Sequence, residues 1–248
     1  MNKIIIENNK LLNQTANNTL EFTKNGEYIL EINNSDKIDL SINVAENICI
    51  KLLIISLDNS IVSNIKYTLE EKSHLIVQKF YYNKQIKEEE NIYLSGKYSK
   101  ITYNFSTITS KEEYYKIRIY HNNNNVVSSL INKCVAFDNS KVTFDIDSIL
   151  DKGNVGCDMN QDTKIINMGD VDAAIRPNMY IEEDDVVARH GSVIGKFSPD
   201  DIFYITSRGI PEKEAILLLI RGFILSNLIV DDSLSEKIIK IINNNYIG

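Results

Sequence analysis

The feature of this sequence that most constrains its fold is a change of hydrophobic period near residue 197. Before that point, polar and apolar residues alternate in short segments such as 39–44, 116–120 and 141–147. Alternation with a period of two is the pattern of half-buried strands. Turn residues rich in Asn, Asp and Ser separate the segments, and no long amphipathic helix lies between them. A doubly wound α/β fold needs such helices as crossovers, so the sequence argues against it.

A sandwich, a barrel or a solenoid remains for these strands. Segments 51–57, 75–82 and 101–108 are rich in β-branched and aromatic residues, which is typical of strands. Short strands, close spacing and turns carrying Asn, Asp and Ser favour a solenoid, although the chain shows no clean fixed-period repeat.

The pattern after residue 197 predicts helices. Ser198 is suited to cap a helix that begins with Pro199, and Gly209 is suited to end it. A second helix over 211–230 carries apolar residues on more than one stripe, so we expect it to bury two faces, one on the β-domain and one on a partner. A last amphipathic helix is expected over 233–244. We therefore divide the chain into a β-domain, residues 1–197, and a helical C-terminal domain, residues 198–248.

Composition and charge exclude several classes of protein. The 248 residues carry a net charge of −7 and no basic cluster with interleaved aromatics, so a nucleic-acid partner is not expected. The stretch 216–230 is too short and too polar to span a bilayer, and the start of the chain lacks an apolar leader pattern. The 3 cysteines show no CxxC spacing, which indicates reduced thiols. We expect a cytoplasmic protein without a membrane span.

The most specific part of the sequence is a C-terminal signature. Residues 184–195 read DDVVARHGSVIG and residues 203–210 read FYITSRGI, and Glu214-Ala215 and Gly222-Phe223 follow. The order and spacing of these motifs resemble the C-terminal signature of the SufB/SufD family, and Gln161 with the segment 165–177 fits the family upstream. A motif of this length is far more specific than a short pattern.

The resemblance implies a fold and partners. It implies a right-handed parallel β-helix (a solenoid, mainly β) followed by a small α-helical C-terminal domain. Family members bind an ABC-type ATPase subunit, SufC-like, through the C-terminal helices, and they pair along the β-helix. We therefore expect this chain to pair with itself or with a paralogous SufB/SufD subunit. The residues expected to dock the ATPase are Phe203, Tyr204, Arg208, Gly209, Ile210, Leu218 and Phe223.

The resemblance also implies a transient iron–sulfur cluster. His190 lies in the signature and is the first candidate for an iron ligand, because imidazole is a common metal ligand. The neighbouring acidic run supplies candidate oxygen ligands, and Cys157 is a candidate to hold sulfur or a cluster. Cys49 and Cys134 lie in apolar strand patterns and are expected in the core. The acidic run consists of Glu182, Glu183, Asp184 and Asp185.

One departure from the family concerns sulfur transfer. The SufB branch has an essential cysteine after the position of Gln161, where this chain has Asp162. The chain is therefore expected to be a SufD-like partner or the sole scaffold of a minimal system.

The chain is not expected to be an enzyme, because it has no Walker-type glycine loop and no recognisable Ser/His/Asp or His-Glu-x-x-His arrangement. Two alternatives stay open. One is a structural assembly protein without a cluster, and the other is a β-solenoid enzyme acting on carbohydrate through clustered carboxylates.

Overall fold

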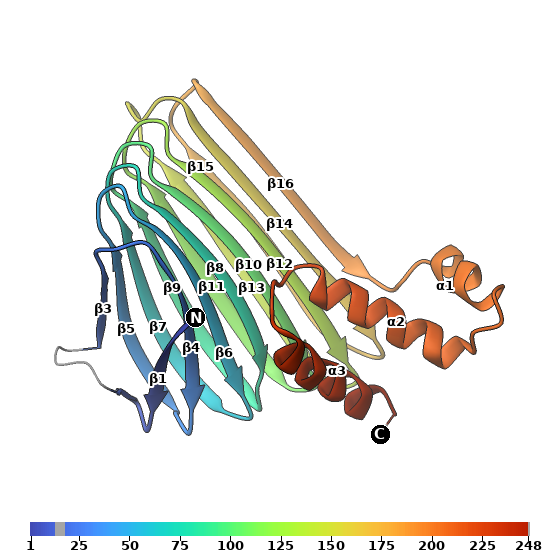
Figure 1. Ribbon diagram of the computed structural model, residues 1–248. Coiled ribbons are helices and arrows are strands. Elements are labelled where there is room, and N and C mark those ends of the chain that lie inside the picture. The colour runs from blue at the N-terminus through green and yellow to red at the C-terminus, as the bar shows by residue number, and fades with distance from the viewer. Residues whose placement is uncertain (13–17, 248) are drawn as a thin grey trace.

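The computed structural model describes residues 1–12 and 18–247. Two sheets, built mainly of parallel strands, face each other along the length of the molecule (Figure 1). Successive strands alternate between the sheets, so that the chain winds as a parallel β-solenoid of about 7 turns. Three helices follow the last strand, and two of them lie against one sheet. The prediction of a mainly β solenoid followed by helices is confirmed.

The larger sheet, called sheet A, contains every even-numbered strand and β1. It contains β16 (Val186–Gly195), β14 (Cys157–Met168), β12 (Val127–Phe137), β10 (Lys100–Thr109), β8 (His74–Tyr82), β6 (Cys49–Leu57), β4 (Gly26–Asn33), β1 (Asn2–Glu7) and β2 (Lys10–Leu11), in that spatial order. Sheet B contains β15 (Asp172–Ile181), β13 (Lys141–Leu150), β11 (Glu112–His121), β9 (Gln85–Leu94), β7 (Ser60–Leu69), β5 (Lys37–Val44) and β3 (Thr19–Phe22). The strands thus begin at Asn2.

The number of residues in a coil varies along the solenoid. Tyr28 pairs with Leu52, 24 positions later, whereas Leu130 pairs with Gln161, 31 positions later. Most of the extra residues lengthen the strands, since β12 and β13 have 11 and 10 residues whereas β4 and β5 have 8 each. This variation explains why the sequence shows no fixed-period repeat.

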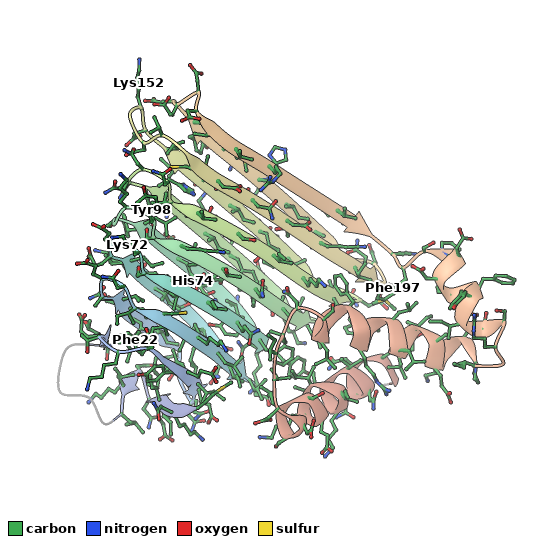
Figure 2. All side chains as sticks on the ribbon, turned by 45° about the horizontal axis from the view of Figure 1, so that its top comes forward. Phe22, Lys72, His74, Tyr98, Lys152 and Phe197 are labelled. Carbon is green, nitrogen blue, oxygen red and sulfur yellow. The ribbon has the colours of Figure 1, made fainter. Side chains whose placement is uncertain are left out.

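The corners of the solenoid are stacked turns with left-handed backbone. Lys72 and Tyr98 have φ angles of 54° and 62° at equivalent places in successive coils, and both lie along one corner in Figure 2. The N–H of Lys72 donates to the carbonyl of Lys97 (2.9 Å), and that of Tyr98 donates to the carbonyl of Asn124 (3.3 Å). Most other corners use Asn or Asp, which tolerate this conformation better.

The three helices are α1 (Pro199–Thr206), α2 (Glu212–Leu225) and α3 (Asp232–Ile247). Ser198 caps α1 through a bond from the N–H of Asp200 to its hydroxyl (3.2 Å), as predicted. Gly209 follows α1 with a φ of 84°, a conformation that suits glycine.

A second apolar core lies between sheet A and the helices. Ile220 and Ile224 of α2 and Ile238 of α3 pack against the outer face of sheet A, where Phe80 and Val135 are buried beneath them. Helices α2 and α3 therefore share a core with the middle coils of the solenoid, separate from the core between the two sheets.

The interior between the sheets also holds buried charges. Lys79 of β8 contacts the carboxylates of Glu88 and Glu90 on β9, the second at 3.0 Å. All three side chains are buried, and the hydroxyls of Tyr67 and Tyr81 donate to the two carboxylates. A buried charge is tolerated only when it is paired and hydrogen-bonded. These side chains must therefore become buried together when the protein folds.

Glu113 on β11 is a further buried carboxyl, and it has no cationic partner among the described residues. The hydroxyls of Thr107 and Tyr115 donate to its Oε2 at 3.0 and 2.9 Å, whereas its Oε1 has no hydrogen-bond partner among the described residues. Burial raises the pKa of Glu113 from 4.5 to about 8. The carboxyl is therefore mainly protonated in the folded protein at neutral pH and ionised in the unfolded chain.

This difference predicts a pH-dependent stability. The contribution of Glu113 is fully present below its unfolded pKa and is lost as pH rises from 4.5 to about 8, by roughly 3 kcal/mol between pH 4.5 and 7. We expect Glu113→Gln to remove this slope, measured by urea unfolding at several pH values. Glu112→Gln, at the exposed neighbouring position, is the matched control and should keep the slope. Equal slopes for the two variants would contradict the assignment.

Candidate functional site

The last coil of the solenoid is open. No strand of the described residues pairs with the outer edges of β15 and β16, and none of the residues of these two strands is buried. At the opposite end of sheet A, β2 pairs antiparallel with β1 and covers part of that edge. The open end exposes apolar side chains together with unpaired backbone N–H and C=O groups. The exposed large apolar residues on these strands are Ile194, which faces the interior side, and Tyr180, Val187 and Val193, which face outward.

His190 lies in the middle of this open end. It pairs in register with Gln161 on β14, whose side chain is buried in the interior of the solenoid. Residues in register on parallel strands face the same side of the sheet. His190 therefore faces the interior side, but no further coil covers it, and its side chain is exposed.

Polar groups beneath His190 form part of the same surface. The amide nitrogen of Gln161 donates to the hydroxyl of Ser148 (2.7 Å) and to the carbonyl of Asn178 (3.3 Å), whereas its Oε1 has no partner among the described residues. Thr163 and Ser192 are paired in the next interior row. Sequence analysis had noted Gln161 only as a position upstream of the signature that fits the family, and the strand register explains why it lies beside His190.

The acidic run does not lie beside His190. It occupies the corner between β15 and β16, and four residues of extended strand, roughly 13 Å, separate Val186 from His190. The Glu183 carboxylate accepts bonds from the N–H groups of Gly153 (2.9 Å) and Asp184 (3.0 Å), which lower its pKa. Among the residues that the structure describes, no group of three or more His, Cys, Asp or Glu side chains could hold a metal ion.

Cys157 begins β14 and lies near that corner. Its thiol is buried and donates to the carbonyls of Asn123 (3.4 Å) and Asn154 (3.3 Å), and burial raises its pKa. It lies four residues before Gln161, so about 13 Å of strand separates it from the row that contains His190. The structure thus brings Gln161 to His190 and keeps Cys157 and the acidic run apart from them.

The other two cysteines differ from each other. Cys134 is buried in the core, as expected. Cys49 is exposed, and the prediction that it belongs to the core was wrong. The alternation of β6 turns Ile50 into the interior, so Cys49 faces outward beside His74 on a part of sheet A that the helices do not cover.

The predicted docking residues lie on and around α1. Phe203 and Tyr204 have exposed fractions of 71% and 61%, and none of the residues of α1 is buried. The Arg208 guanidinium stacks 3.5 Å from the centroid of the Tyr204 ring and donates to the Tyr204 carbonyl (2.6 Å). Leu218 of α2 is also exposed.

Phe223 has a different environment from the other docking candidates. Its ring packs edge-on against Phe197, with centroids 6.2 Å apart, and the ammonium groups of Lys133 and Lys164 lie over it at 5.1 and 5.9 Å. It therefore contributes to the attachment of α2 to the solenoid.

An apolar groove of about 850 Å³ lies beside α1. Its apolar wall is formed by Met168 at the end of β14, Phe197, Ile202, Phe203 and Ile216. Phe197 marks its position between the strands and the helices in Figure 2. Sequence analysis had missed the groove, because it forms only where three separate elements meet.

A family model described as SUF system FeS cluster assembly, SufBD core domain, matches residues 39–223. The chain is 50% identical over 48 residues to an iron–sulfur cluster assembly SufBD family protein of Mycobacterium leprae, a segment that covers 19% of this chain and 12% of the relative. It is 46% identical over 48 residues to the iron–sulfur cluster assembly protein SufD of Bacillus subtilis, covering 19% of this chain and 11% of the relative. These alignments span only a small part of each relative. Within residues 1–12 and 18–247, no helix is long and apolar enough to cross a membrane.

Proposed function

The chain belongs to the SufBD core-domain family of the SUF system for iron–sulfur cluster assembly, and we propose that it is a non-catalytic, cytoplasmic scaffold subunit of that system. In this proposal the open end of the solenoid pairs with a second SufB/SufD-type subunit. The helices dock an ABC-type ATPase, and a nascent cluster forms transiently near His190.

The observation that carries the proposal is the open last coil. Exposed sheet edges pair readily with other chains, and proteins cover them unless pairing is their purpose. Here both edge strands carry exposed apolar side chains, including Tyr180 and Ile194. The occupant is a second subunit of the same fold, because only another pair of strands satisfies both edges at once. Either a second copy or a paralogue meets this requirement.

Docking of the ATPase is supported by the surface of α1. Phe203 and Tyr204 project into solvent beside the apolar groove, and exposed aromatic side chains are enriched at binding hot spots. The stacked Arg208 holds Tyr204 in place before binding, which lowers the entropic cost of association.

Pairing would also complete a site for iron. One copy offers an exposed imidazole at the open end, and among the described residues no group of three or more His, Cys, Asp or Glu side chains could hold a metal ion. A pairing subunit would bring its own ligands to the same seam, so we propose that His190 holds iron only across the paired interface. This arrangement suits a cluster that must be released after assembly.

The docking proposal is tested by changing α1 without disturbing the core. We expect Phe203→Ala with Tyr204→Ala to weaken binding of the ABC-type ATPase subunit from the same organism at least tenfold in calorimetric titration, because both side chains are exposed before binding. Deletion of 211–248 would be less informative, since it uncovers the second core. Ile229→Ala is the matched control, because Ile229 is also exposed but lies beyond the other end of α2. Unchanged affinity of the double variant would overturn docking through α1.

The cluster proposal is tested by anaerobic reconstitution with ferrous iron and sulfide, using the chain together with its pairing subunit. We expect His190→Ala to lower bound iron and visible absorbance at least twofold. His74→Ala is the control, since His74 lies half-buried on the outer face of sheet A. If the His190 variant retained as much iron as the wild-type protein, His190 would be removed from the site. If the wild-type protein acquired no absorbance, the alternative of an assembly protein without a cluster would be favoured.

A further inference from the structure

The connection between α2 and α3, residues 226–231, is attached to sheet A by polar bonds. Asn227 is buried, although it is an amide at an otherwise apolar interface. Its Nδ2 donates to the carbonyl of Phe105 on β10 (2.9 Å) and to that of Ile131 on β12 (3.1 Å). One side chain therefore bridges two successive coils.

Two further side chains extend this attachment. The hydroxyl of Ser106 on β10 donates to the carbonyl of Ile224, at the end of α2 (3.2 Å). The side-chain amide of Gln78 on β8, oriented to satisfy both of its polar atoms, donates to the carbonyl of Ile229 and accepts from its N–H, each at 3.0 Å. The connection is thus bonded to three successive coils, those of β8, β10 and β12.

The apolar contacts around this connection do not fix where α2 and α3 lie along sheet A as these hydrogen bonds do. Ile108 of β10, Val135 of β12 and Ile166 of β14 lie in one register row on the outer face of sheet A. Such a row presents a similar aliphatic surface at each strand, about 4.8 Å apart. Burial of apolar surface is non-directional, so this row by itself would favour a helix displaced by one coil almost as well.

We propose that Asn227 and Gln78 are positioning residues that fix α2 and α3 at one place on the solenoid. The side chains of Ser106 on β10 and Gln78 on β8 do not recur at the same register position on the neighbouring coils. A shift by one coil would therefore take Asn227, Ile224 and Ile229 away from these partners, which selects one position. Helix α1 has no buried residue and packs against α2. The functional consequence of this attachment rests on the proposed function. An ATPase that moves α2 would also move the middle coils of the solenoid.

The test measures the distance between the helices and the solenoid in the chain alone. Spin labels are attached to the exposed Cys49 on β6 and to a cysteine introduced by Glu236→Cys on α3, while Cys134 and Cys157 are buried. We expect one narrow distance distribution. Gln78→Leu with Asn227→Leu should broaden it or add a second population displaced by about 4.8 Å, one coil spacing. Asn244→Leu, an amide-to-aliphatic change on the exposed surface of α3, is the matched control and should leave the distribution narrow.

A distribution that stays narrow and unshifted in the double variant would overturn the proposal, because the remaining contacts would then fix the helices without Asn227 and Gln78. If the double variant fails to fold, Gln78→Leu alone decides the matter. It removes the bonds to one coil and retains Asn227, and an unchanged distribution in this variant would likewise contradict the proposal. The measurement requires no ATPase, so a failure of docking through α1 and a failure of this attachment are distinguished.

Discussion

The constraint on which the structure depends is the hydrogen-bonded ladder between successive coils. Each strand satisfies its backbone groups by pairing with the strand one coil later, for example Leu130 with Gln161, so the ladder is complete only where another coil follows. A solenoid cannot close on itself as a barrel does, and its last coil must therefore expose an edge. This geometry explains why the outer edges of β15 and β16 are open. It also explains why His190 faces the interior side of its sheet and is nevertheless exposed to solvent.

The same ladder separates the surfaces of the molecule. The end of the solenoid is available for a second subunit, whereas the outer face of sheet A carries α2 and α3 through a core of its own. Helix α1 projects beyond both, with Phe203 and Tyr204 exposed. In the proposed scaffold, one surface of the chain binds a subunit of its own fold and another binds the ATPase, and the middle coils connect the two surfaces (Figure 1).

Much of this architecture could be predicted from the sequence, since period two and the cap at Ser198 are local signals. The buried Lys79–Glu88–Glu90 cluster was not predicted, because charged residues normally indicate a solvated face. Its strand nevertheless carried a signal: Glu88 and Glu90 share their parity with Ile86 and Ile92, which are also buried. The groove beside α1 and the distance between His190 and Cys157 depend on coil stacking, which no local pattern contains.

The most direct test of this account is the strength of pairing through the open end, measured by analytical ultracentrifugation of the chain alone and with its paralogous subunit. The substitution Ile194→Lys places a charge on the seam, and Val62→Lys places one at a similarly exposed apolar position on the outer face of sheet B, the exposed fractions being 45% and 57%. The account predicts that wild-type protein and the Val62 variant pair equally well, and that the Ile194 variant pairs at least tenfold more weakly. Equal pairing by the Ile194 variant, or a wild-type chain that stays monomeric with both partners, would contradict it.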